Sequence, residues 1–220
     1  MDSIPGARAH TRRVISELAE SIRERDRFTY DHCRRVAIYV YRLARFSGWP
    51  RAAARELALA GLVHDLGKTW VRNEVLLKPA ALSQSEREMI EKHPVTAAQL
   101  LWAFDMPDLI LDAVLSHHER WDGRGYPERR GGEEIPLGAR LLSVADVFDV
   151  ITTPRPYKAA MSVEAARERI LEGAGTSFDP AVAEMFTHLL DAQPAFLLWA
   201  QPQPVDVETH DPWAEHDSGE

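Results

Sequence analysis

Residues 54–67 read ARELALAGLVHDLG, a run of small and aliphatic side chains that is interrupted by charge only near its two ends. The pattern predicts a compact apolar helix that ends at Gly67. Charged side chains are seldom buried without partners, yet His64 and Asp65 lie in this apolar helix. The pair therefore requires an explanation from other parts of the chain.

Helical spacing continues on both sides of this stretch. Val14, Leu18 and Ile22 recur every four residues and predict a helix over about 8–25. Further helices are predicted through 36–44 with a stop at 47–48, from a capping box at 83–86 to about 102, from about 107 to 117–118, from about 136 to 151, and from 180 onward. No stretch alternates with a period of two, so the predicted fold class is all-α.

Composition restricts the class of protein. A chain of 220 residues with 45% hydrophobic and 27% charged residues is typical of a soluble globular domain. No apolar run approaches the roughly 18 residues that span a bilayer, so no membrane segment is expected. Cys33 is the single cysteine, which excludes an internal disulfide and favours a reducing, cytoplasmic location.

The charge is concentrated at the end of the chain. Of the net charge of −8, the last twenty residues contribute −6, because they hold six acids and no Lys or Arg, and −2 remains for the rest. Duplex nucleic acid is therefore not an expected partner. We expect an N-terminal helix over 1–27, packed on or preceding the main domain, the domain itself over 28–192, and an acidic, proline-containing tail over 193–220.

Histidines and carboxylates recur across the predicted helices. Five of the nine histidines fall between residues 32 and 118, and Asp146 lies in the apolar segment LLSVADVFDV (141–150). Imidazoles and carboxylates that converge from separate helices are the ligands of a site for two divalent metals, in which Asp65 can bridge both ions. The absence of clustered cysteines disfavours structural zinc.

Each of these residues also has an ordinary explanation when it is taken alone. His64 and Asp65 are explained by a core histidine bonded to a carbonyl and a capping acid, and Lys68 by the dipole at a helix end. His10, His188, His210 and His216 keep such explanations, and Trp121 is interpreted as packing, with the flank of a purine as the alternative.

Taken together, the motifs resemble a known family. His32, HDLGK (64–68), HP (93–94), HHERWDGRGYP (117–127), PLGARLLSVADVFDV (136–150) and RPYK (155–158) resemble, in order, the HD-GYP branch of the HD phosphohydrolases. The resemblance covers roughly residues 28–187. It implies a helical HD domain with a dinuclear metal centre in the helix bundle and a role in bacterial signalling.

The implied activity is hydrolysis of cyclic di-GMP to linear pGpG and, after a second cleavage, to GMP, by attack of a metal-bridging hydroxide. The resemblance implies these metal ligands: His32, His64, Asp65, His93, His117, His118 and Asp146. It makes Asp65 and Lys68 catalytic. The implied substrate contacts are Lys68, Tyr126, Asp149, Arg155 and Lys158.

One position departs from the family pattern. Relatives with three metals carry a Glu one helical turn before the first ligand histidine, where this chain has Phe28. We therefore predict two ions, with iron or manganese favoured, while zinc, nickel and cobalt also suit these ligands.

Three alternatives stay open: an HD phosphohydrolase for another cyclic dinucleotide, one for another nucleotide, and a non-catalytic cyclic di-GMP receptor. A homodimer or a regulatory protein partner is compatible with each of them.

Overall fold

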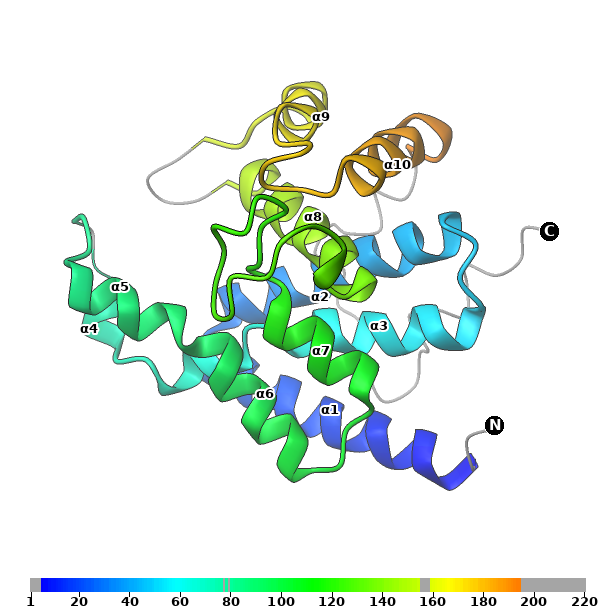
Figure 1. Ribbon diagram of the computed structural model, residues 1–220. Helices are drawn as coiled ribbons and strands as arrows, with labels where there is room; N and C mark the ends of the chain where they lie inside the picture. Colours follow the sequence, from blue (N-terminus) through cyan, green and yellow to red (C-terminus); the bar gives the residue numbers. More distant parts are fainter. Residues whose placement is uncertain (1–4, 77, 79, 155–158, 195–220) are drawn as a thin grey trace.

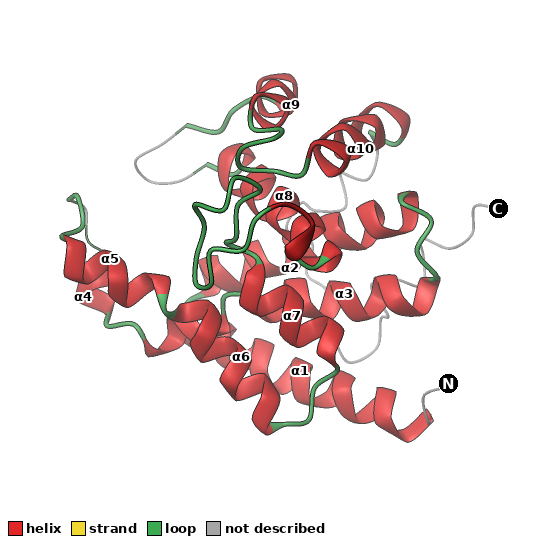
Figure 2. Cartoon of the chain, in the orientation of Figure 1, coloured by secondary structure: helices red, strands yellow, loops and turns green. Residues whose placement is uncertain are grey.

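The computed structural model describes residues 5–76, 78, 80–154 and 159–194, and every regular element among them is helical (Figures 1 and 2). The elements are α1 (Pro5–Arg25), α2 (Arg27–Phe46), α3 (Arg51–Val63), the 3₁₀ helix η1 (Leu66–Trp70), α4 (Asn73–Leu76), α5 (Gln84–Glu91), α6 (His93–Ala103), α7 (Asp108–Ser116), the 3₁₀ helix η2 (Gly132–Glu134), α8 (Leu137–Thr152), α9 (Val163–Glu172) and α10 (Pro180–Ala192). The predicted all-α class is confirmed.

Helices α2, α3, α7 and α8 form the centre of the domain. Helix α2 packs against both α3 and α8, and α7 packs between α3 and α8. The apolar residues predicted from the 54–67 stretch supply this centre, since Leu57, Ala58, Ala60 and Val63 are fully buried. The site residues on these four helices are therefore held by a close-packed core.

The remaining helices cover this centre. Helix α1 packs on α2 and α3, with Val14, Ile15 and Ile22 buried against them. Helices α9 and α10 lie over α8 on the opposite side, at the top of Figure 1. None of the described helices combines the length and the apolarity that crossing a bilayer requires. The boundaries 28 and 192 stay predictions.

Two predicted helices end differently in the structure. The helix of 54–67 does not continue to Gly67: α3 ends at Val63, and His64 and Asp65 lie in the turn that leads into η1. The predicted helix over 83–102 is divided into α5 and α6 at Lys92. Pro94 explains the division, because it has no N–H to donate to the carbonyl of Ile90 four residues earlier.

Helix α9 is missing from the predicted elements, although its ends carry ordinary signals. The Ser162 hydroxyl accepts the N–H of Ala165 at its start, and Gly173 follows its last residue. The predicted acidic tail lies outside the described residues except for 193 and 194.

Candidate metal centre

Three histidines reach the centre of the molecule from places where a helix ends or begins. His64 follows α3, His117 follows α7, and His93 is the first residue of α6. Each Nδ1 donates to the carbonyl three residues earlier: to Gly61 at 2.8 Å, Ile90 at 2.8 Å and Val114 at 2.7 Å. Since a carbonyl only accepts, Nδ1 carries a proton in each ring, and Nε2 is the nitrogen that has a lone pair when the ring is neutral.

These lone pairs face one another in the interior. His93 Nε2 lies 3.3 Å from His117 Nε2 and 3.3 Å from Oδ1 of Asp65. Together with His118, these side chains form a group whose potential ligand atoms all lie within 4.8 Å of one another. Two acceptors at such a separation repel each other unless a positive charge lies between them.

A second group lies on the other side of Asp65. It consists of His32 from α2, His64 and Asp146 from α8. Asp146 Oδ1 lies 3.1 Å from His32 Nε2 and 3.8 Å from His64 Nε2. The second oxygen of Asp65, Oδ2, lies 3.8 Å from His32 Nε2 and 3.7 Å from His64 Nε2. The two oxygens of one carboxylate thus face two different groups.

His32 is oriented in a different way from the other three. It lies within α2, where backbone carbonyls are used by the helix, and its Nδ1 lies 2.7 Å from Oδ2 of Asp149. Arg35, one turn later, donates to both oxygens of Asp149 at 2.6 and 2.9 Å. Asp149 is 1% exposed, with both oxygens engaged. Asp149 thus lies behind His32, and its implied role as a substrate contact stays a prediction.

Burial sets the protonation of the imidazoles. It lowers the pKa of His64, lowers that of His117 well below its usual value, and lowers that of His118 to about 3. For His32 burial acts in the same direction, but hydrogen bonds to Asp146 and Asp149 outweigh it and raise the pKa to about 9. Three of these rings are therefore neutral near pH 7, which is the form that binds metals.

The carboxylates stay ionised although they are buried. Burial raises the pKa of Asp65, but the positive charge of Lys68 outweighs it and holds the pKa well below its usual value. Burial also raises the pKa of Asp146, and its hydrogen bond with His32 reverses the direction. Lys68 Nζ donates to Asp65 Oδ2 at 2.7 Å, and its side chain is 25% exposed.

The arrangement fits divalent cations. Among the described residues, His64 Nε2 and Asp65 Oδ1 are buried atoms that have no hydrogen-bond partner. An unpaired buried acceptor is costly, and a cation removes that cost. Neutral imidazoles and carboxylates are also the donor set that iron, manganese and zinc accept.

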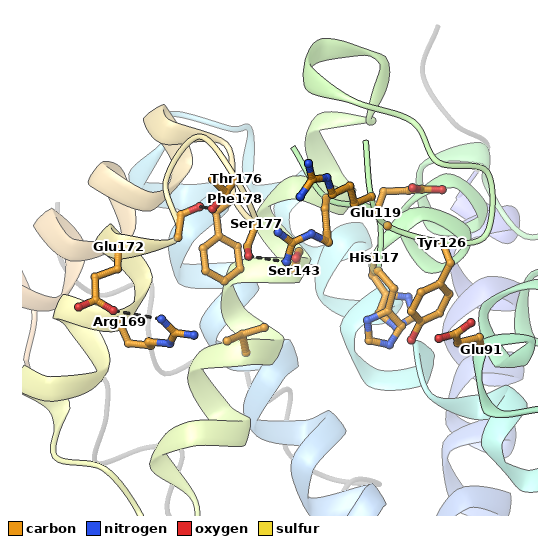
Figure 3. A pocket seen from close by; sticks show the side chains of 16 residues that line it. Glu91, His117, Glu119, Tyr126, Ser143, Arg169, Glu172, Thr176, Ser177 and Phe178 are labelled. Atoms are coloured by element: carbon orange, nitrogen blue, oxygen red, sulfur yellow. Dashed lines mark hydrogen bonds and ion pairs between the residues drawn. The ribbon is translucent and has the colours of Figure 1, made fainter. Parts of the chain in front are cut away.

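A cavity of about 640 Å³ opens beside this centre (Figure 3). His117, His118 and Tyr126 line one side of it, and Tyr126 packs against His118 with ring centroids 4.8 Å apart. The loop that carries Tyr126 is fixed in place, because Tyr126 N–H donates to the carbonyl of His118 and the buried Glu119 accepts the N–H of Glu128 at 2.6 Å. These hydrogen bonds hold the Tyr126 side of the cavity in place.

The structure brings the expected metal ligands together in the two groups described above. Lys68 and Tyr126 lie at the same centre. Arg155 and Lys158 lie outside the described residues, and Phe28 occupies the first turn of α2 with 42% of its surface exposed. Arg35 and Glu119 were not identified from the sequence. The signal for Arg35 is its spacing of one helical turn from His32. The signal for Glu119 is its position directly after His117 and His118.

Comparisons with known proteins identify the family of this domain. The family model described as HD domain matches residues 14–182. A protein named cyclic di-GMP phosphodiesterase from Vibrio cholerae is 38% identical over 78% of this chain and 37% of its own length. One named 3'3'-cGAMP-specific phosphodiesterase 2, from the same organism, is 32% identical over 81% of this chain and 34% of its own. The chain thus spans about a third of these relatives.

A solved structure shares the fold. The crystal structure of a cyclic GMP-AMP-specific phosphodiesterase of V. cholerae superposes with a TM-score of 0.62 at 23% identity, covering 78% of this chain and 46% of that one. Together, the family match, the relatives and the order of the motifs show that the chain belongs to the HD domain family, in its HD-GYP branch.

Proposed function

We propose that this chain is a metal-dependent phosphodiesterase that hydrolyses cyclic di-GMP. One observation carries the proposal: the two oxygens of Asp65 face separate groups of imidazoles beside a cavity of about 640 Å³. A shared carboxylate between two nitrogen-rich groups is a common arrangement of two-metal hydrolytic sites. The names of relatives at 38% and 32% identity support a cyclic dinucleotide as the substrate.

We assign one ion to His32, His64, Asp65 and Asp146, and a second to Asp65, His93, His117 and His118. Iron or manganese is the expected metal, and two ions are expected because Phe28 offers no ligand atom. When bound, two such cations polarise a phosphate and lower the pKa of a water molecule toward neutrality.

The side chains of the protein would have three tasks in the reaction. Lys68, held by Asp65 and partly exposed, would neutralise charge on the phosphate. Tyr126, which packs against His118, would contact the substrate on that side of the cavity. Arg155 and Lys158 stay expected contacts for the phosphates. The product, linear pGpG or GMP, follows from how many of the two phosphodiester bonds are cut.

A second candidate substrate is 3'3'-cGAMP, because relatives named for it match this chain over a similar length. The cytoplasmic location and the homodimer or regulatory partner remain predictions. A cyclic di-GMP receptor without turnover is the remaining alternative.

The experiment combines metal analysis with a turnover assay. Purified protein should hold about two metals and convert cyclic di-GMP to pGpG or GMP. Asp65→Ala should lose the metals and the activity, whereas Asp112→Ala, an exposed acid on α7, should keep both. Metal-loaded wild type that binds cyclic di-GMP but turns over none of the cyclic dinucleotides would establish the receptor instead.

A further inference from the structure

The cavity extends from the metal centre to a wall with a different chemistry. Figure 3 shows Arg169 and Glu172 of α9 on the side opposite Tyr126 and His117. Arg169 Nη1 lies 3.1 Å from Glu172 Oε2, and their side chains are 63% and 65% exposed. The wall therefore presents the guanidinium donors of Arg169 next to the carboxylate of Glu172, and both groups are accessible to a ligand.

This wall is joined to the loop of Tyr126. The N–H of Asp122 donates to the carbonyl of Thr176 at 2.9 Å, and Arg120 Nη1 donates to Ser177 Oγ at 2.7 Å. Both sides of the cavity thus form one connected frame in which a ligand finds its partners already in place.

Apolar side chains complete the wall. Val147, next to the ligand Asp146 in the chain, lines the cavity together with Phe178. Phe178 packs into the core with 7% exposure and presents a small apolar surface there. An apolar surface beside paired polar groups is suited to a nucleobase, whose faces stack and whose edges form hydrogen bonds.

We propose that Arg169 and Glu172 form a guanine subsite that selects the base of the bound cyclic dinucleotide. This inference rests on the proposed function. Guanine presents the O6 acceptor next to its N1–H and N2–H donors, which match an Arg donor next to a carboxylate. Adenine presents the reverse order, with the N6 donor facing the Arg and the N1 lone pair facing the Glu. The pair therefore favours guanine and rejects adenine.

The test compares substrates rather than total activity. Glu172→Gln replaces one acceptor oxygen by a donor and should raise KM for cyclic di-GMP by roughly ten-fold or more, with kcat nearly unchanged. KM for cyclic di-AMP should change little or fall, and 3'3'-cGAMP, with one guanine, should be intermediate. Arg169→Met should likewise reduce the difference in KM between cyclic di-GMP and cyclic di-AMP.

The chain offers a matched control in an ion pair that joins the same helix to α10. Arg167 Nη2 lies 3.2 Å from Asp191 Oδ2, with side chains 39% and 60% exposed, and neither residue lines the cavity. Asp191→Asn should leave all KM values unchanged. Exposed pairs contribute little to stability, so both variants should fold. Equal increases in KM for the three dinucleotides with Glu172→Gln, or an equal effect of Asp191→Asn, would overturn the subsite.

The subsite can be tested even if the proposed function fails. If metal-loaded wild type cleaves no cyclic dinucleotide, the enzyme proposal falls, and equilibrium binding replaces KM as the readout. Wild type should then bind cyclic di-GMP more tightly than cyclic di-AMP, and Glu172→Gln should remove that preference. Wild type that binds the two equally would contradict the guanine subsite itself.

Discussion

The orientation of single imidazole rings depends on where each histidine lies in its helix. His64 and His117 follow helix ends, and His93 follows the break at Lys92; each ring bonds a backbone carbonyl of the preceding turn. His32 lies within α2, where the helix uses these carbonyls. It therefore needs a side-chain acceptor, and Asp149, held by Arg35, supplies it.

Arg35→Gln should weaken one metal site selectively. Without the two bonds from Arg35, Asp149 can turn away from His32, and partners of this kind typically contribute 10–100-fold in metal affinity. We expect the second ion, at His93, His117 and His118, to be retained, so the metal content should fall from about two toward one at limiting metal. Metal titration followed by elemental analysis measures this change.

The Arg140–Asp179 pair provides the control for this variant. Its side chains are 16% and 7% exposed, against 15% and 2% for Arg35 and Asp149, and its N–O distance is 2.7 Å. Arg140→Gln should lower stability without changing the metal content. If both variants lose metal to the same extent, Arg35 acts only through the stability of the fold.

At the scale of elements, the sequence predicted helices better than it predicted their ends. The apolar pattern of 54–67 identified α3, but its end at Val63 depends on His64 and Asp65 turning toward partners from α2, α6 and α8. The division at Lys92 follows from Pro94, which has no N–H for the carbonyl of Ile90, and His93 Nδ1 donates to that carbonyl instead. The break at Lys92 thus has a local signal in Pro94, whereas the end of α3 is associated with contacts at the site, which no local pattern contains.

Gly67→Ala should disturb the contact between η1 and α6. A Cβ at Gly67 would lie 2.0 Å from the carbonyl oxygen of His93, so η1 must move away from α6. Because η1 follows Asp65 directly, the distance between Asp65 and His93 should increase. We expect a loss of about 1–3 kcal/mol in unfolding free energy together with weaker metal binding. Denaturant unfolding and metal titration measure the two effects.

Gly48→Ala is the control for Gly67→Ala, because it introduces backbone strain without a steric contact. Gly48 has φ of +82°, and a Cβ there meets nothing within 4 Å. The substitution should cost about 1 kcal/mol through the backbone alone and leave metal binding intact. Metal binding by Gly67→Ala as tight as that by Gly48→Ala would contradict the role of the η1–α6 contact.

At the scale of the whole molecule, the sequence indicated which residues carry the chemistry, but not the separate role of each residue. The order of the motifs was sufficient to predict the residues that converge. Two contacts were not predictable from the sequence. Asp149 contacts His32, which is far away in the chain, and Glu119 accepts the N–H of Glu128 because the loop folds back on itself. The wall of α9 was also not predicted, since its helix was missed.

Without bound metal, the buried polar groups of the site are expected to lower the stability of the folded protein. Asp65, Asp146 and four of the ligand histidines are buried, and two of their atoms lack hydrogen-bond partners in the described part of the chain. Bound cations would compensate these groups, and a ligand at 100 times its Kd stabilises the folded state by about 2.7 kcal/mol. For a domain of this size, that corresponds to a Tm increase of roughly 5–10 °C.

Removal of metal with a chelator should therefore lower the Tm by roughly that amount, and adding Mn²⁺ or Fe²⁺ back should restore it. Differential scanning calorimetry at several metal concentrations measures the change, which should grow with the logarithm of free metal. Asp65→Ala should have a low Tm that does not respond to metal, because the carboxylate facing both groups is gone. A wild-type Tm that is the same with chelator and with metal would mean that the buried groups satisfy one another without an ion.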